Sequence, residues 1–183
     1  MKGPIAAVAI ILIGLVLSAS SSLTLPLGFG VAEFWLGVAV EVAGCLWFGA
    51  WGLIACVIFP FLSSLLIGLD LTHALAEFPA NILQGAIPAV VFRRTGADPA
   101  LHDARSTRIY ALWAVIIPSL LGGLLAAGAL TLLDLSDWSN LAVLGFDWAV
   151  SNGLVLAVIG FPLLYLLTPI LRERGLLISG WWR

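Results

Sequence analysis

The centre of the chain reads Glu77-Phe78-Pro79-Ala80-Asn81-Ile82-Leu83-Gln84-Gly85-Ala86-Ile87-Pro88. Most of this stretch is apolar enough to enter a lipid bilayer, but Glu77, Asn81 and Gln84 occur at i, i+4 and i+7. That spacing places all three polar side chains on one face of a helix. Because polar groups at membrane depth are costly unless they face protein, water or a ligand, we predict that this helix forms the wall of a small-molecule pocket.

The composition is that of a polytopic membrane protein. Of 183 residues, 62% are hydrophobic and 10% are charged, and the mean hydropathy is +1.13, whereas soluble domains are nearer half apolar and a quarter charged. The length accommodates about six spans of ~20 residues and little else. We therefore predict one all-α integral membrane domain over residues 1–183, a bundle of six transmembrane helices. The net charge of −2 gives no reason to expect a nucleic-acid partner.

Apolar runs predict the positions of the spans, which are about 4–23, 31–48, 51–69, 74–92, 109–133 and 148–171. The first run follows Lys2 and ends in a serine-rich segment, so a cleaved signal peptide is the alternative there. Asp70 or Thr72 is predicted to cap the helix that carries the polar stripe. Prolines are expected to break or kink that helix and to interrupt the fifth run. Residues 134–147 are predicted to be a loop, with a short interfacial helix around 138–146 as the alternative.

Charged residues predict the orientation. With six spans, all eight basic residues fall on one side of the membrane: Lys2, Arg93, Arg94, Arg105, Arg108, Arg172, Arg174 and Arg183. The opposite connections contain no Lys or Arg, and their charged residues are all acidic: Glu33, Asp70, Asp134, Asp137 and Asp147. The positive-inside rule then places both termini in the cytoplasm of a multi-pass cell-membrane protein.

Ionisable and aromatic side chains supply the candidate ligand-binding residues. Glu41 lies in the middle of the second predicted span, where a carboxylate is a candidate functional group by default; a hydrogen bond between helices is its alternative role. The same alternative applies to Asn81 and Gln84. Tryptophans beside carboxylates suit a flat, neutral or cationic ligand. The predicted substrate-binding residues are Glu41, Glu77, Asn81, Gln84, Trp35, Asp147, Trp148 and Asn152.

Motifs for catalysis or metal binding are absent from the sequence. It has no CxxC pair, no Cys/His cluster with zinc spacing, no phosphate-cradling glycine loop, no GxSxG and no HExxH. We expect no enzymatic activity, no cofactor and no metal, and we expect Cys45 and Cys56 to be buried free thiols. Small residues from Gly3 to Ala7 and from Gly14 to Ser18 predict a close helix contact, within the bundle or with a partner subunit.

Several segments resemble the substrate-binding S-components of energy-coupling factor (ECF) transporters. The turn Phe48-Gly49-Ala50-Trp51-Gly52-Leu53 is similar to the family's turn between its second and third spans. Residues 79–85 with Phe92-Arg93-Arg94 are similar to its fourth span, and Asn152 to Pro162-Leu163-Leu164-Tyr165 is similar to its last. The resemblance implies capture of a vitamin-like ligand at the outer side, a transmembrane coupling subunit and two cytoplasmic ATPases. Metal-transporting relatives have a histidine where this chain has Lys2, which argues against nickel or cobalt.

A weaker resemblance is to MASE-type membrane sensory domains, which also carry asparagine and Arg-Arg features in mid-chain. The predicted function is therefore a substrate-binding membrane subunit of an uptake transporter for a small vitamin-like or heteroaromatic nutrient. The alternative is a membrane-embedded sensory or assembly subunit without transport activity.

Overall fold

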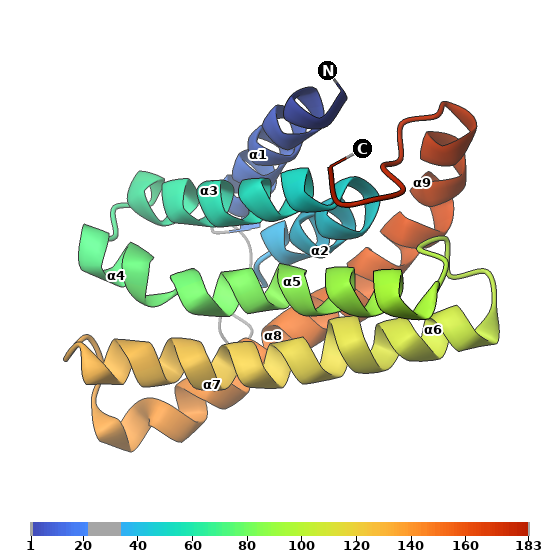
Figure 1. The fold of residues 1–183 in the computed structure, drawn as a ribbon. Helices are drawn as coiled ribbons and strands as arrows, with labels where there is room; N and C mark the ends of the chain where they lie inside the picture. Colours follow the sequence, from blue (N-terminus) through green and yellow to red (C-terminus); the bar gives the residue numbers. More distant parts are fainter. Residues whose placement is uncertain (1, 22–33, 183) are drawn as a thin grey trace.

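The computed structural model describes residues 2–21 and 34–182, and these residues form helices without a β-strand (Figure 1). The all-α prediction is confirmed. The helices are α1 (Lys2–Ser21), α2 (Gly37–Phe48), α3 (Ala50–Leu66), α4 (Leu71–Ala76), α5 (Phe78–Thr95), α6 (Ala104–Tyr110), α7 (Ile117–Leu132), α8 (Leu141–Val155) and α9 (Phe161–Glu173). Two π-helical segments, η1 (Ala111–Ile116) and η3 (Leu156–Gly160), join α6 to α7 and α8 to α9, and a short 3₁₀ turn, η2 (Trp138–Asn140), precedes α8.

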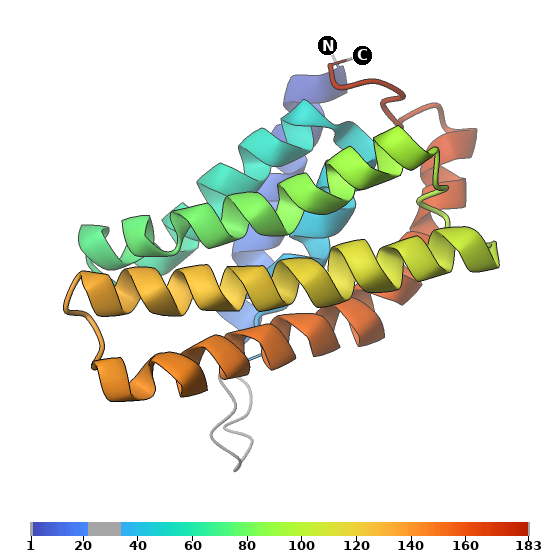
Figure 2. The same ribbon diagram turned by 60° about the horizontal axis from the view of Figure 1, so that its bottom comes forward.

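The helices form a bundle in which α5 packs between α3 and α7 (Figures 1 and 2). Helix α1 packs on α2 and α3, and α8 packs on α7. The buried core gathers around α2, with Val38, Val42 and Leu46 against Phe92, Tyr110 and Leu156. Both ends of the described chain lie close together (Figure 2), where Lys2 Nζ donates a 2.7 Å hydrogen bond to the Gly175 carbonyl.

Among the described residues, four helical stretches are long and apolar enough to cross a membrane: Lys2–Ser20, Leu71–Thr95, Ala104–Leu132 and Trp138–Glu173. Helices α2 and α3 are also apolar but have only 12 and 17 residues. At 1.5 Å per residue they extend roughly 18 and 26 Å, less than the ~30 Å of a bilayer core. The described helices are thus compatible with a membrane protein.

Several helix boundaries differ from the apolar runs of the sequence. Helix α5 continues to Thr95 and ends at Gly96, whose φ of +66° is typical of a helix C-cap. Helix α6 begins at Ala104 rather than at 109, because the Asp103 side chain accepts a 2.8 Å hydrogen bond from the Ser106 N–H. Both extensions are polar helical turns, which hydropathy alone does not reveal.

The segment predicted to be a loop over 134–147 is largely helical. Helix α8 begins at Leu141, seven residues before the predicted start at 148, and runs on without a break into the last predicted span. The predicted loop is therefore wrong, and the alternative short helix is the first part of α8. At the other end of the chain, α2 begins at Gly37; the predicted start at 31 lies outside the described residues, as does Glu33.

The break between α4 and α5 confirms two local predictions. The Asp70 side chain accepts a 2.8 Å hydrogen bond from the His73 N–H and caps α4. Helix α4 ends at Ala76, and α5 begins at Phe78 with Pro79 in its first turn. In the first turn of a helix the N–H that proline lacks would have no partner within the helix. Pro88, in contrast, lies inside α5 without ending it.

Pro118 does not interrupt the fifth helix, contrary to the prediction. A proline lacks the N–H that would bond the carbonyl four residues earlier, here that of Ala114. The Gln84 Nε2 donates to this carbonyl at 3.3 Å, and π-helical η1 precedes the proline. Pro162 likewise follows the π-helical η3, whose Leu156 carbonyl accepts the Phe161 N–H and also the Tyr110 hydroxyl at 2.8 Å. At Pro118, a side chain from another helix thus takes the place of the missing backbone donor.

The small residues of α1 face the bundle. A Cβ added to Gly3 would lie 2.2 Å from the Trp51 ring, and one added to Gly14 would lie 2.6 Å from the Phe59 ring. The Trp35 Nε1 donates to the Ser18 hydroxyl at 2.8 Å. These contacts confirm the role within the bundle. The opposite face of α1 is apolar and exposed, with Ile5, Val8, Leu12, Ile13 and Val16.

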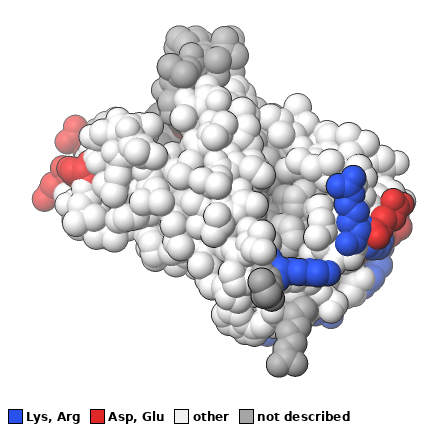
Figure 3. Space-filling model, turned by 90° about the horizontal axis from the view of Figure 1, so that it is seen from above, with Lys and Arg blue, Asp and Glu red and all other residues white. Residues whose placement is uncertain are grey.

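Charged side chains gather at two opposite ends of the molecule, with uncharged surface between them (Figure 3). We name them the acidic end, which holds the α3–α4 and α7–α8 connections, and the basic end, which holds both ends of the described chain and the α5–α6 connection. Contacts hold the basic end together: Arg172 pairs with Asp98, and Arg93 Nε donates to the Gly180 carbonyl at 3.4 Å.

Candidate ligand-binding cavity

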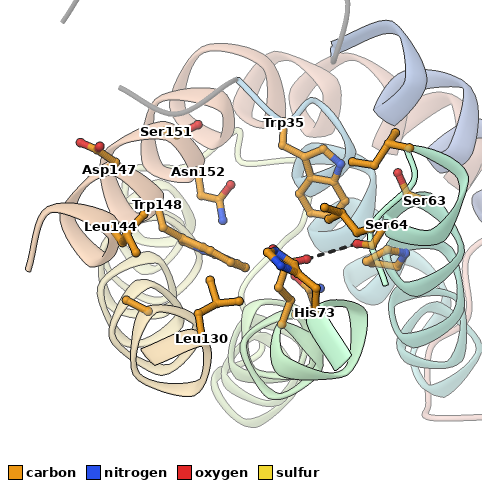
Figure 4. A pocket seen from close by; sticks show the side chains of 16 residues that line it. Trp35, Ser63, Ser64, His73, Leu130, Leu144, Asp147, Trp148, Ser151 and Asn152 are labelled. Carbon is orange, nitrogen blue, oxygen red and sulfur yellow. Dashed lines mark hydrogen bonds and ion pairs between the residues drawn. The ribbon is translucent and has the colours of Figure 1, made fainter. Parts of the chain in front are cut away.

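A cavity of about 490 Å³ lies between α3, α4–α5, α7 and α8, and its lining includes residues of the acidic end (Figure 4). This volume lies in the range of small-molecule sites. Its walls combine apolar, aromatic and polar side chains: Trp35, Pro60, Ser63, Ser64, Ile67, Leu69, His73, Glu77, Asn81, Ala127, Leu130, Leu144, Asp147, Trp148, Ser151 and Asn152.

Six of the eight predicted binding residues line this cavity: Trp35, Glu77, Asn81, Asp147, Trp148 and Asn152. Glu77 and Asn81 lie one turn apart at the α4–α5 break. Asp147, Trp148 and Asn152 come from α8, and Trp35 comes from the segment before α2. The structure therefore brings together side chains that are as much as 117 positions apart in the sequence, from Trp35 to Asn152.

Glu77 is held in place on both sides of its carboxylate. The Ser64 hydroxyl donates to Oε2 at 3.2 Å, and His73 Nε2 lies 3.6 Å from Oε1. The side chain keeps 22% of its surface exposed. Each carboxylate oxygen has two lone pairs, so both oxygens can accept a further hydrogen bond from a molecule in the cavity.

Asn81 and Asn152 are buried amides that line the cavity. They are 7% and 5% exposed, and neither side chain has a hydrogen-bond partner among the described residues. Their polar atoms are not among the fully buried, unpartnered side-chain atoms of the described residues, so the amides border the cavity and are not sealed inside the protein. The cavity is the place from which a ligand or ordered water can supply the missing partners.

The two indole rings enter the cavity from different helices, Trp148 from the α8 side and Trp35 from the α2 side (Figure 4). Trp35 is fixed by its hydrogen bond to Ser18 and by stacking on Phe59, with ring centroids 5.7 Å apart. The Trp148 Nε1 is buried and has no partner among the described residues. The rings offer flat apolar surfaces on which a planar molecule can stack.

Gln84 and Glu41 do not line the cavity. Gln84 is 1% exposed and bonds Ala114 through Nε2, while its Oε1 has no partner. That oxygen and Trp148 Nε1 each lie 3.5 Å from the point where a Cβ of Gly122 would stand, so both side chains approach α7 at Gly122. Glu41 is fully buried in α2 and neither carboxyl oxygen has a partner within the described chain.

Sequence reasoning missed Ser64 and His73, the two side chains that contact Glu77. His73 and Glu77 are four residues apart, a spacing typical of paired side chains on a helix, so that contact could have been found. Ser64 lies in the apolar run of α3, and only the fold shows its neighbour. Ser63 and Ser151 also line the cavity and carried no signal in the sequence.

Among residues 2–21 and 34–182, no group of three or more His, Cys, Asp or Glu side chains is placed so that it could hold a metal ion. The thiols of Cys45 and Cys56 are free and buried, 3.0 Å apart, and do not line the cavity.

Comparisons with protein-family models, with curated proteins and with solved structures found no match to this chain. The cavity and its side chains are therefore the basis for inferring function.

Proposed function

We propose that the chain is the substrate-binding membrane subunit of an uptake transporter for a small vitamin-like or heteroaromatic nutrient. The observation that supports this most directly is the pair of buried, unpartnered amides of Asn81 and Asn152 facing a cavity between two indole rings. Such a cavity has the volume, the apolar walls and the few polar groups of a small-molecule site. The proposal assigns binding to the chain and no catalysis.

In this proposal the bundle crosses the cell membrane six times, with α2 and α3 as the two short spans. The basic end, where the Lys and Arg visible in Figure 3 gather, lies in the cytoplasm by the positive-inside rule. The acidic end then faces outward, and the cavity opens to the side from which a nutrient arrives. Both termini are cytoplasmic in this orientation.

The roles of the lining residues follow from their chemistry. Trp35 and Trp148 stack on the faces of a planar ring. Glu77, Asn81 and Asn152 bond its polar edge inside the bundle, while Asp147 lies near the mouth. Gln84 approaches α7 at Gly122, as Trp148 does. Glu41, which the sequence also predicts as a binding residue, lies outside the cavity and is given no ligand contact here.

The sequence has no nucleotide-binding motif, so in this proposal the energy for transport comes from elsewhere. The resemblance to ECF S-components implies a transmembrane coupling subunit and cytoplasmic ATPases as partners. The exposed apolar face of α1 is compatible with contact to lipid or to such a subunit.

Native mass spectrometry of the purified protein in a mild detergent tests the binding role. We expect a retained small molecule that is lost in the double variant Asn81→Ala/Asn152→Ala. A matched control is Asn140→Ala, at an asparagine before α8 that does not line the cavity. Uptake of the released molecule by cells that express the chain with its partners should fall in the same double variant. An empty native protein together with unchanged uptake would refute the proposal. A retained ligand without any uptake would indicate the sensory or assembly role instead.

A further inference from the structure

The charges around the cavity differ from those of the chain as a whole. Its titratable lining residues are Glu77, Asp147 and His73, and no Lys or Arg lines it among the described residues. The basic side chains lie at the opposite end of the molecule (Figure 3). An anionic ligand would therefore enter this cavity beside two carboxyl groups and without a Lys or Arg to pair with it, which is unfavourable at low effective dielectric.

The acceptors in the cavity surround one corner of it. Glu77 has free lone pairs on both carboxylate oxygens, since each has only one neighbouring polar side chain. Asn81 lies one helical turn further along the same face, and its amide is buried and unpartnered. A protonated amine carries three N–H donors and no acceptor, and hydrogen bonds between charged groups are stronger than neutral ones.

The indole rings fit the remainder of such a ligand. Trp148 and Trp35 enter the cavity from different sides, near His73 (Figure 4), whose Nε2 lies 3.6 Å from the Glu77 carboxylate. Indole faces attract cations within about 6 Å as well as stacking on flat rings. Asn152, on the α8 side, provides a donor and an acceptor for a neutral ring heteroatom.

We propose that the ligand of this cavity is an organic cation: a small ring-bearing molecule whose protonated amine binds Glu77 and Asn81 while its ring lies between Trp35 and Trp148. This inference rests on the proposed function, because it takes the cavity to be the binding site, and it names the substrate class. Discrimination against an anion of the same shape then comes from Glu77.

Three small pyridines of the same skeleton but different charge provide the test. They are 3-(aminomethyl)pyridine as the cation, 3-pyridinemethanol as the neutral molecule and nicotinate as the anion. Dissociation constants are measured by ligand-detected NMR with purified protein in an uncharged detergent, at neutral pH. We expect the amine to bind about tenfold or more tightly than the alcohol, as one charge-assisted hydrogen bond allows, and nicotinate to bind most weakly.

Two charge-removing variants assign the preference to the cavity. Glu77→Gln keeps the shape and the contact with Ser64, and it should reduce the advantage of the amine to about twofold or less. Asp134→Asn removes the same charge from the acidic end outside the cavity, at a backbone φ of +56° that asparagine tolerates, and should leave the preference unchanged. Equal effects of both variants, or tighter binding of the alcohol or nicotinate, would overturn the cation assignment while leaving a binding subunit in place. If no probe binds and the native protein is empty, the proposed function fails with it.

Discussion

Replacing Glu41 with methionine should stabilise the protein, because this carboxyl group is buried without a partner. The side chain is 0% exposed, and neither oxygen has a hydrogen-bond partner in the described part of the chain. A buried polar group without a partner costs about 1–3 kcal/mol in proteins. Methionine is unbranched and of similar length, so it should fill the same space at a packing cost of less than about 1.5 kcal/mol.

The expected net gain is about 1–2 kcal/mol of unfolding free energy, which for a chain of this size corresponds to a rise in Tm of roughly 2–8 °C. A thiol-reactive fluorogenic dye measures this directly, since Cys45 and Cys56 are both buried and become reactive only when the bundle opens. Ligand binding should be unchanged in Glu41→Met, because residue 41 does not line the cavity.

Thr168→Val is the matched control, because Thr168 is a buried polar residue with partners. Its hydroxyl accepts from Trp47 Nε1 at 2.8 Å and donates to the Pro99 carbonyl at 3.2 Å. Leaving those groups unpaired should lower the stability by about 1–3 kcal/mol. If Glu41→Met lowers Tm as Thr168→Val does, then the carboxyl group has a partner and our interpretation of it is wrong. If Glu41→Met abolishes ligand binding, the original sequence prediction for this residue is right.

Three further predictions concern the helices and the basic end. Gly122→Ala should raise Tm slightly, because its nearest side-chain atoms would be 3.5 Å from the added Cβ and alanine favours helix by about 1 kcal/mol. Arg93→Ala should free residues 176–182 for faster hydrogen exchange, since the guanidinium bonds the Cys45 carbonyl at 3.3 Å and lies 4.7 Å from the Trp181 ring. The stability that Asp98 contributes should be lost in acid. Burial raises the pKa of this carboxyl, but the hydrogen bonds from Arg172 and from the Ala100 N–H lower it by more than burial raises it. The net pKa is therefore below its usual range. A carboxyl group whose pKa is lower in the folded state than in the unfolded state stabilises the folded protein at pH values above its unfolded-state pKa. This contribution to stability is lost as the pH falls through the folded-state pKa.

Each of these three predictions has a control measurement or a control variant in the same chain. Gly128→Ala, on the same helix with nothing within 4 Å of its Cβ, should raise Tm by the same amount as the change at Gly122; a fall at 122 alone would show that the space there is already filled. Arg94→Ala, at an exposed neighbour, should leave the exchange of the tail unaltered. The Tm difference between the native protein and Asp98→Asn should shrink between neutral pH and about pH 3, and a constant difference would contradict the sign given above.

The polar stripe shows what local sequence can and cannot reveal. Helical spacing predicted that Glu77 and Asn81 share a face, and both line the cavity. The same spacing predicted Gln84 beside them, yet Gln84 bonds the carbonyl of Ala114. That carbonyl lacks its usual donor because Pro118, thirty-four residues beyond Gln84 in the sequence, has no N–H. No property of the stripe itself carries this information, since it depends on which helix packs opposite.

Helix ends were least predictable where polar residues form them. Hydropathy located the apolar runs but ended them too early at the α5–α6 connection, where Asp103 caps a charged first turn. The start of α8 was missed because Asp147 in the middle of an apolar segment indicated a loop. The position of Asn152 on the cavity wall follows from how α8 packs on α7, through close backbone contact at Gly123 and Gly145.

The π-helical segment η1 decides which side chains of α7 the cavity meets. A π turn inserts one residue into an α-helix, and each residue advances the helix by about 100°. Everything that follows η1, including Gly122, Ala127 and Leu130, is therefore rotated by that angle relative to an uninterrupted rod. Straightening residues 111–116 into α geometry without removing a residue would turn a different set of α7 side chains toward the cavity, whereas deleting one residue of the π turn would leave the downstream side chains facing as they do. The shape of the cavity wall is thus determined several turns away from it, in a stretch that does not line the cavity.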